Sequence, residues 1–235
     1  MSEGDSIEER LAEIKSRIEA AKERGGRKDS KVSLVAVSKK QPVSKMASYK
    51  EICEARGEIP IFGENYVQDF RDKSAHLGGK LIAHLIGPLQ SNKAKLAVQL
   101  FDVIESIDSI AIAEEVNKQA AKAGKRQQVY LQINISQDSA KHGFAPDEVE
   151  DLIIGSFVKL DNLEVRGLMT ITKLYENPES ARPDFRALTA LAGRLERHCS
   201  SPLEISMGMS DDFEVAIEEG ATHVRIGTAL FGSRE

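Results

Sequence analysis

The feature that most constrains the fold is an eightfold alternation of short, β-branched apolar segments with longer helical segments. The segments that predict strands are, in chain order, Val32–Ser38, Ile59–Phe62, Ile82–Ile86, Val103–Ile107, Val129–Ile135, Glu164–Met169, Leu203–Met207 and His223–Ile226. The segments that predict helices between them include Val43–Ala55, Ile110–Ala123, Pro146–Phe157, Pro178–Ser200 and Asp211–Glu219. Parallel strands joined by crossover helices form a closed barrel or an open doubly wound sheet. Eight repeats in 235 residues favour a single (β/α)8 TIM-type barrel, with the open sheet as the alternative.

An additional amphipathic helix is predicted before the first strand. Ile7, Leu11, Ile14 and Ile18 recur at three- and four-residue spacing with charged residues on the other face, and Gly25-Gly26 ends the pattern. No Pro/Gly/Ser-rich linker, low-complexity tract or shift in composition divides the chain. We therefore expect residues 1–235 to form one domain.

Composition and charge exclude several classes of function. The net charge of −5 argues against a nucleic-acid surface, because neutralising phosphates requires clustered Lys and Arg. No apolar run approaches the roughly 20 residues that cross a membrane, and the N-terminus lacks the apolar core of a signal peptide. Cys53 and Cys199 form no metal-ligand spacing and are expected to be reduced thiols. We expect a cytoplasmic protein without a bound metal.

Chemically capable residues gather where the predicted strands end, which is where barrel enzymes build their active sites. They are, in strand order, Ser38-Lys39-Lys40, Gly63-Glu64-Asn65-Tyr66, residues 87–93, Ser106-Ile107-Asp108, Asn134 and Ser136, Met169-Thr170, residues 206–210, and residues 225–228. Each strand end is polar or glycine-rich. Such residues are placed more regularly here than the general composition of loops would produce.

Lys39 closes the first apolar strand and is expected to point toward the barrel mouth. Burial and neighbouring cations favour the neutral amine of a lysine in such a place, and a neutral amine is a nucleophile for aldehydes. The alternative is an ordinary surface lysine just past a strand. Lys40 is expected to point away, because side chains alternate along a strand.

The last two strands are followed by sequences typical of a phosphate site, S-M-G-M-S and V-R-I-G-T. Backbone N–H groups, small hydroxyl side chains and a helix N-terminus bind phosphate there in many barrels. Ser210 also fits a helix N-cap ahead of Asp211 and Asp212, and Gly227 also fits a tight turn. A phosphate site facing a reactive lysine suits a phosphorylated aldehyde or ketone, either pyridoxal 5′-phosphate (PLP) or a sugar phosphate.

Arg225 lies two residues before Gly227 and should face the barrel interior, where an arginine is costly unless it is paired or hydrogen-bonded. Against a pyridine ring nitrogen, its charge would keep that nitrogen unprotonated. The alternative is an ion pair with Glu164 or Asp211. Among weaker candidates, His84 is more typical of a hydrogen-bonded core histidine than of a base. Lys93 and Lys95 fit either an anion site or a solvated helix face, and Tyr66 fits either a hydroxyl near the ring or packing.

Six segments together resemble the YggS/PROSC family of pyridoxal phosphate homeostasis proteins. They are LVAVSKKQP, FGENYVQDF, HLIGPLQSNK, GLMTI, SMGMSDDFEVAI and VRIGTALFG, and they span nearly the whole chain. One departure is Ala83-His84, where the family commonly has Trp-His. The family is similar to the barrel domain of alanine racemase and ornithine decarboxylase, without their second, β-rich domain.

The resemblance implies a PLP site with defined residues. Lys39 forms the Schiff base, Arg225 faces the pyridine nitrogen and Asn65 lies beside the cofactor. Ser210, Gly227 and Thr228 hold the phosphate, and Ser206 and Met207 line the same pocket.

The resemblance also implies a binding role rather than a catalytic one. A racemase of this architecture takes a second acid/base from its other domain, and we expect that domain to be absent, leaving one cofactor face open to solvent. We therefore predict a monomeric protein that buffers PLP or delivers it to PLP-dependent apo-enzymes and affects amino- and keto-acid balance indirectly. A weak single-domain amino-acid racemase and a Schiff-base aldolase acting on sugar phosphates are the alternatives.

Overall fold

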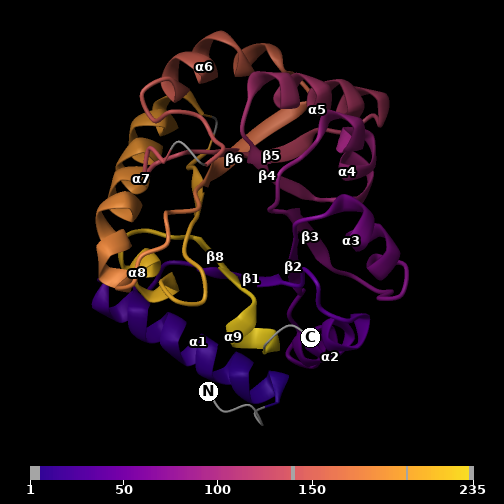
Figure 1. Cartoon of the computed structure of the whole chain (residues 1–235), viewed down its shortest axis with the longest axis vertical. Coiled ribbons are helices and arrows are strands. Elements are labelled where there is room, and N and C mark those ends of the chain that lie inside the picture. Colours follow the sequence, from indigo (N-terminus) through magenta and orange to yellow (C-terminus); the bar gives the residue numbers. More distant parts are fainter. Residues whose placement is uncertain (1–5, 139–140, 200, 233–235) are drawn as a thin grey trace.

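The computed structural model describes residues 6–138, 141–199 and 201–232 as a closed barrel of eight parallel strands (Figure 1). The strands are β1 (Ser33–Val37), β2 (Ile61–Glu64), β3 (Ile82–Leu85), β4 (Val103–Ile107), β5 (Gln127–Gln132), β6 (Leu163–Met169), β7 (Glu204–Ser206) and β8 (His223–Ile226). Each strand pairs with the next, and β8 pairs with β1 to close the ring. The predicted TIM-type barrel is confirmed, and the open doubly wound sheet is wrong.

Helices surround the strands on the outside of this ring (Figure 1). They are α1 (Ile7–Arg24), α2 (Val43–Ala55), α3 (Val67–Ser74), α4 (Ala94–Leu100), α5 (Ile110–Lys122), α6 (Val149–Gly155), α7 (Arg182–Leu195), α8 (Phe213–Glu218) and α9 (Thr228–Phe231). Short 3₁₀ turns are η1 (Ser91–Lys93), η2 (Phe157–Lys159), η3 (Pro178–Ala181) and η4 (Glu196–His198). The prediction for Val43–Ala55 matches α2 at both ends.

Three predicted helices are shorter or more broken than expected. The segment Pro178–Ser200 divides into η3, α7 and η4, because Pro178 and Pro183 each stand at the start of a new helical element, where proline fits. Residue 200 lies outside the described residues. The predicted helix Asp211–Glu219 begins only at Phe213, and Pro146–Phe157 is helical from Val149 and continues as η2.

β4 and β8 match their predicted bounds, and the other six strands differ at one end or both. In β2 and β5, polar or glycine residues join the ladder. β2 extends past Phe62 to Glu64, since Gly63 pairs with His84 and Glu64 with Leu85. β5 starts at Gln127 rather than Val129, because Gln127 and Gln128 pair with Leu163 and Glu164 of β6, and the buried Gln127 side-chain amide donates to the backbone carbonyl of Asp102. Tertiary pairing overrides local propensity at both places.

Helix α1 covers the part of the barrel that α8 and α9 are too short to cover. Ser6 and Glu9 form a capping box that begins the helix. Its apolar stripe of Leu11, Ile14 and Ile18 is buried, and the helix packs against α8, α9 and α2. Figure 1 shows α1 lying alongside α8 and α9. The extra N-terminal helix is therefore part of the outer layer that supports the end of the chain.

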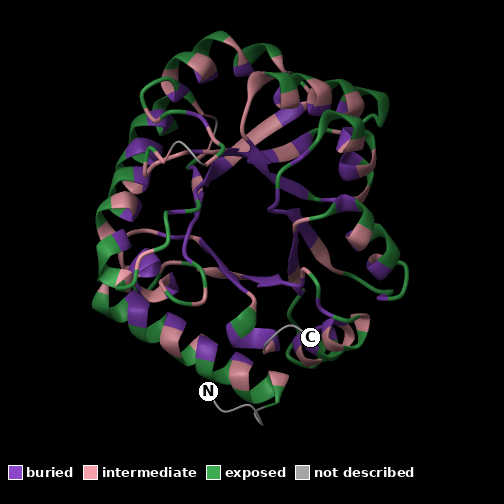
Figure 2. Cartoon of the chain, in the orientation of Figure 1, coloured by how far each residue is buried: buried purple, intermediate pink, exposed green. Residues whose placement is uncertain are grey.

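The strand residues are largely buried (Figure 2). Their apolar side chains pack into two separate clusters. Ala36, Phe62 and Leu131 belong to the main apolar core, whereas Val103, Tyr130 and Met169 form a separate small cluster. Alternation along each strand places the second cluster in the barrel interior. Over the described ranges, no helix combines the length and apolarity needed to cross a membrane.

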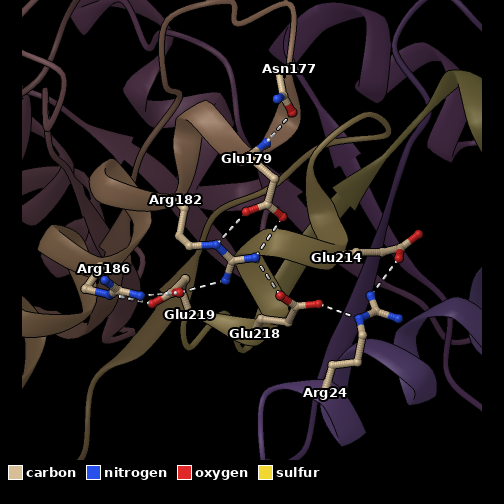
Figure 3. Close-up of polar contacts among 8 residues, drawn as sticks. All are labelled: Arg24, Asn177, Glu179, Arg182, Arg186, Glu214, Glu218 and Glu219. Carbon is tan, nitrogen blue, oxygen red and sulfur yellow. Dashed lines mark hydrogen bonds and ion pairs between the residues drawn. The ribbon is translucent and has the colours of Figure 1, made fainter.

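An ion-pair network joins α1, η3, α7 and α8 (Figure 3). Arg182 at its centre bonds Glu179, Glu218 and Glu219, and Arg24 of α1 bonds Glu214 and Glu218 of α8. Asn177 caps η3 by accepting from the backbone N–H of Glu179. These contacts raise the pKa of Arg182 above its ordinary value. The network ties the β6–α7 connection to the helix that follows β7.

Replacing Arg182 with Met should lower the free energy of unfolding by about 1 kcal/mol, because three carboxylates lose a shared, half-buried partner. Denaturant unfolding at low salt measures the loss. In 1 M NaCl the difference from the wild type should shrink, since charges are then screened over roughly 3 Å. Arg186→Met removes only an exposed bond to Glu219 and should cost less; an equal cost for both variants would contradict this account.

Candidate cofactor site

The backbone next to Lys39 is fixed by hydrogen bonds on every polar atom of Ser38. The Ser38 N–H donates to the carbonyl of Gly63, its carbonyl accepts from Gln41 N and Lys73 Nζ, and its hydroxyl donates to Glu64 Oε1 at 2.8 Å. Lys39 is half-buried after β1, and the exposed Lys40 has a φ of 57°, in the left-handed region. The two lysines therefore differ in exposure.

A buried ion pair lies beneath Ser38, between the sheet and α3. Lys73 Nζ lies 3.0 Å from Glu64 Oε1 and 2.7 Å from Asp69 Oδ2, while the Glu64 side chain is fully buried. The second oxygen of Glu64 has no hydrogen-bond partner in the described part of the chain. Burial raises the pKa of the Glu64 carboxyl, and the charge of Lys73 opposes that rise. Sequence reasoning singled out Glu64 only as a strand-end residue and missed Lys73.

Asn65 follows β2, and its Oδ1 atom is buried and unsatisfied within the described residues. Gly87, after β3, allows the two loops to approach each other, since a Cβ there would lie 2.5 Å from the backbone oxygen of Asn65. A buried amide oxygen without a partner is the kind of group that a bound molecule satisfies.

The loops after β7 and β8 meet at Ser210. Its hydroxyl accepts from the backbone N–H of Ala229 at 3.5 Å, so it lies beside the first turn of α9. Gly208 has a φ of +88°, and a Cβ there would lie 2.5 Å from the Cβ of Ala216. The helix N-cap interpretation of Ser210 is wrong: α8 starts at Phe213, and Asp212 Oδ1 accepts from the backbone N–H of Met209.

Gly227 and Thr228 stand at the start of α9, next to the end of β1. A Cβ on Gly227 would lie 3.3 Å from Val37, two residues before Lys39. Thr228 is exposed at the rim. Strand pairing therefore brings the predicted phosphate residues beside the strand that carries the lysine.

A cavity of about 1140 Å³ opens at this rim. Ser210, Thr228 and Ala229 are among the described residues that line it, together with basic side chains such as Lys45 and Lys173. Lys39, Asn65 and Arg225 are not among them. The cavity thus covers the phosphate side of the predicted site and not the part inside the barrel.

Arg225 is 4% exposed and is held inside the barrel by two hydrogen bonds. It donates through NH1 to Ser206 Oγ at 2.8 Å and through NH2 to the Thr170 carbonyl at 2.7 Å. Burial lowers the pKa of its guanidinium. The alternative ion pair with Glu164 or Asp211 is wrong: Glu164 pairs with Arg166, and the carboxylates that face Arg225 are Glu105 and Asp212.

Ser206 and Met207 point in different directions. Ser206 is fully buried and joins Arg225 through its hydroxyl. Met207 is also fully buried but belongs to the main apolar core. The structure therefore brings Ser206 to Arg225, while only the backbone of Met207 remains a candidate contact.

The interior also holds a carboxylate that sequence reasoning missed. Glu105 accepts from Ser206 Oγ at 2.6 Å and lies 2.5 Å from His84 Nδ1. Burial alone would raise the pKa of Glu105, but the hydrogen bond and charge of His84 and the charge of Arg225 lower it to about 2. A charged residue at an inward position of a buried strand was the available signal. His84 is confirmed as a buried, hydrogen-bonded core histidine.

The weaker candidates lie at the surface. Tyr66 is 54% exposed at the start of α3, Lys93 is half-buried in η1, and Lys95 is exposed on α4. Lys95 therefore fits the alternative in which it lies on a solvated helix face. Cys53 and Cys199 are both free thiols.

The arrangement fits a phosphorylated aromatic aldehyde. An unsatisfied amide oxygen on Asn65, a fixed interior cation and a rim of hydroxyl and backbone N–H groups match the ring and phosphate ends of such a molecule. Lys39 at the neighbouring strand end would supply an amine.

Comparison with known proteins identifies close relatives over the full chain. The sequence profile described as alanine racemase, N-terminal domain, matches residues 10–235. The pyridoxal phosphate homeostasis protein of Aquifex aeolicus is 40% identical over 229 residues, covering 97% of this chain and 98% of the relative. The one from Escherichia coli K12 is 37% identical, covering 98% of each.

Solved structures agree with this relationship. PipY of Synechococcus elongatus PCC7942, with PLP bound, has a TM-score of 0.81 at 35% identity and covers 97% of this chain and 100% of PipY. Alanine racemase of Clostridium difficile 630 has a TM-score of 0.73 at 15% identity, covering 94% of this chain and 56% of the racemase. At that identity the likeness establishes a shared fold alone.

Lys73→Met should lower the free energy of unfolding by about 3 kcal/mol at pH 8, because it leaves the buried Glu64 carboxylate without its cation. The folded-state pKa of Glu64 lies above its unfolded value, so its contribution to stability falls as pH rises through that range. Removing Lys73 raises this pKa further. The loss should therefore be smaller at pH 5, where Glu64 is closer to neutral.

Urea unfolding of the protein without added ligand, at both pH values, measures this loss. Glu64→Gln combined with Lys73→Met should recover most of it, and the exposed Lys95→Met should cost a few tenths of a kcal/mol at most. An equal loss at pH 5 and pH 8 would show that the Glu64 charge is not involved.

Proposed function

The chain belongs to the family of pyridoxal phosphate homeostasis proteins, and we propose that it binds PLP at the mouth of its barrel and takes part in PLP homeostasis. The observation that carries the proposal is the meeting of three strand ends. Ser210 lies beside α9, Arg225 is fixed beneath by Ser206, and β1 brings Val37, two residues before Lys39, against Gly227. These groups would suit a phosphate, a ring nitrogen and an aldehyde respectively.

Each residue has a distinct part in the proposed site. Ser210, Gly227 and Thr228 hold the phosphate at the cavity rim, Asn65 lies beside the ring, and Ser206 and the backbone of Met207 line the interior side. Arg225 would donate to the ring nitrogen and keep a proton off it, because its own fixed charge opposes a second cation. Bound PLP supplies an aldehyde that condenses with amines.

Lys39 captures that aldehyde. Its amine would condense with the aldehyde carbon, and the aldehyde oxygen would leave as water. The hydrogen bonds on Ser38 limit the movement of the backbone from which Lys39 extends. A fixed backbone lowers the conformational cost of each capture.

We propose that the protein carries PLP rather than using it for efficient catalysis. Racemisation needs an acid and a base on opposite faces of the ring. Tyr49 is in the core and Tyr130 bonds Glu204 inside the barrel, while the Tyr175 hydroxyl donates to Asp184. Burial and that bond raise the pKa of Tyr175 to about 12. The remaining tyrosine, Tyr66, is mostly exposed, so water would surround it.

The proposed role in buffering and delivering PLP follows from a solvent-accessible, reversible linkage between Lys39 and the PLP aldehyde. A protein that holds PLP and releases it on demand buffers the free aldehyde and delivers it to PLP-dependent apo-enzymes, with indirect effects on amino- and keto-acid balance. We propose that residues 1–235 act as one cofactor-binding domain, as a monomer in the cytoplasm, without nucleic-acid or membrane partners.

Lys39→Ala should abolish the visible absorbance that appears when PLP is added, because no amine remains at the end of β1 to condense with the aldehyde. Lys40→Asn is the matched control: it removes the adjacent amine, and asparagine tolerates the left-handed backbone at this position. It should behave as the wild type. A wild-type protein that stays colourless would favour the sugar-phosphate alternative over PLP.

Prolonged incubation of the PLP-loaded protein with each L-amino acid should produce no more D-isomer than free PLP at the same concentration. Chiral chromatography of the products measures this. The exposed position of Tyr66 is the physical reason, since a solvated hydroxyl is a poor acid/base at neutral pH. Sustained turnover in excess of one D-amino acid per protein molecule, above the PLP control, would support the racemase alternative.

A further inference from the structure

Glu105 is a fully buried carboxylate in the interior of the barrel, on β4. Its Oε2 atom accepts from Ser206 Oγ on β7 at 2.6 Å, and its Oε1 atom lies 2.5 Å from His84 Nδ1 on β3. Because Glu105 is ionised well below neutral pH, the His84 nitrogen is the donor in that contact. Both oxygens are therefore held, each by a different strand.

The Ser206 hydroxyl connects this carboxylate to Arg225. Ser206 donates its proton to Glu105 and accepts from Arg225 NH1 at 2.8 Å. The other amino group of Arg225 donates to the Thr170 carbonyl at 2.7 Å. A series of hydrogen bonds thus crosses the barrel from β8 to β3, through Arg225, Ser206, Glu105 and His84.

Glu105 is also the deeper of the two negative charges that face Arg225. The other is Asp212, which lies ahead of α8, lines the rim cavity and accepts from the backbone N–H of Met209. A cation between a buried and a rim carboxylate turns toward whichever attracts it more. The charge of Glu105 therefore favours an inward orientation of the guanidinium.

Further charged and titratable groups face Glu105 from the surrounding strands. They are His84 on β3, Tyr130 on β5, and His223 and Arg225 on β8. Burial lowers the pKa of His223, which favours its neutral form. Arg225 is thus the permanent cation among the described groups facing Glu105.

We infer that Glu105 is a positioning residue: its charge, acting through Ser206, holds Arg225 where it meets the ring nitrogen of the bound cofactor. This inference rests on the proposed function and adds to it a residue of β4 that reaches Arg225 through Ser206. His84 restrains the carboxylate in this arrangement by occupying its second oxygen. The charge of Glu105, rather than its shape, is the property that matters.

Glu105→Gln keeps the shape and removes the charge. Arg225 then faces only Asp212 and turns toward the rim, so the Kd for PLP should rise about tenfold, equivalent to about 1.4 kcal/mol. The absorption band of the bound cofactor should shift, because the ring nitrogen loses its fixed donor. Glu204→Gln is the matched control, since Glu204 also lies on β7, two residues before Ser206, but bonds Tyr130 and Arg166. It should leave the Kd and the band unchanged.

A double-mutant cycle with Arg225→Gln separates positioning from a general structural role. In the Arg225→Gln background, Glu105→Gln should change the Kd less than about twofold, because the charge that it positions is gone. Without PLP, the double variant should unfold at a higher temperature than Glu105→Gln alone, since removing both members of a buried pair costs less than removing one.

The inference is overturned if Glu105→Gln binds PLP with the wild-type Kd and spectrum, or if its effect is equally large without Arg225. If Glu105→Gln does not fold, Ser206→Ala replaces it: both charges remain, but the bridging hydroxyl is lost, and the same spectral shift should appear. An unchanged spectrum in Ser206→Ala then contradicts the inference. Failure of the wild type to bind PLP would overturn the proposed function instead, while the unfolding comparison of the ligand-free variants would still stand.

Discussion

Closure of the barrel is the constraint on which the rest of this structure depends. Because β8 pairs with β1 as well as with β7, the first and last strands of the chain become neighbours, and Gly227 lies against Val37. All eight strands are parallel, so their carboxyl ends share one rim. Residues nearly 190 positions apart, Lys39 and Arg225 among them, are thereby brought to the same end of the molecule. An open sheet would separate them.

The same closure buries the inner face of every strand, and this makes charge pairing decisive. A buried arginine is tolerated only with partners, and Arg225 obtains them from Ser206, Thr170 and, through Ser206, Glu105. Between the sheet and α3, Lys73 likewise pairs with the buried Glu64 beneath Ser38. The proposed PLP site therefore depends on two buried groups of charged residues, one inside the barrel and one between the sheet and α3. The first holds Arg225 and the second holds Ser38, the residue before Lys39, so stability and ligand binding share their determinants.

The sequence was sufficient for the architecture, because the eightfold alternation admits few arrangements and periodicity locates most strands. β4 and β8 match their predicted bounds, whereas β2 and β5 extend into glycine and glutamine residues that pair only in the context of their neighbours. Lys39, Arg225 and Ser210 were recognisable from strand ends and from family motifs. Glu105, Lys73 and the role of Asp212 were not, because their importance comes from contacts across the barrel or between layers. The expected N-cap at Ser210 failed for a related reason, since the loop uses Asp212 to bind Met209 instead.

The most direct test of the central claim, that Lys39 holds the cofactor, is chemical. The protein is loaded with PLP, treated with borohydride to make the linkage permanent, digested, and mapped by mass spectrometry. The account predicts the added pyridoxyl mass on the peptide that contains Lys39, and on Lys39 itself by fragmentation. A pyridoxyl mass found mainly on another lysine, or on none, would contradict it.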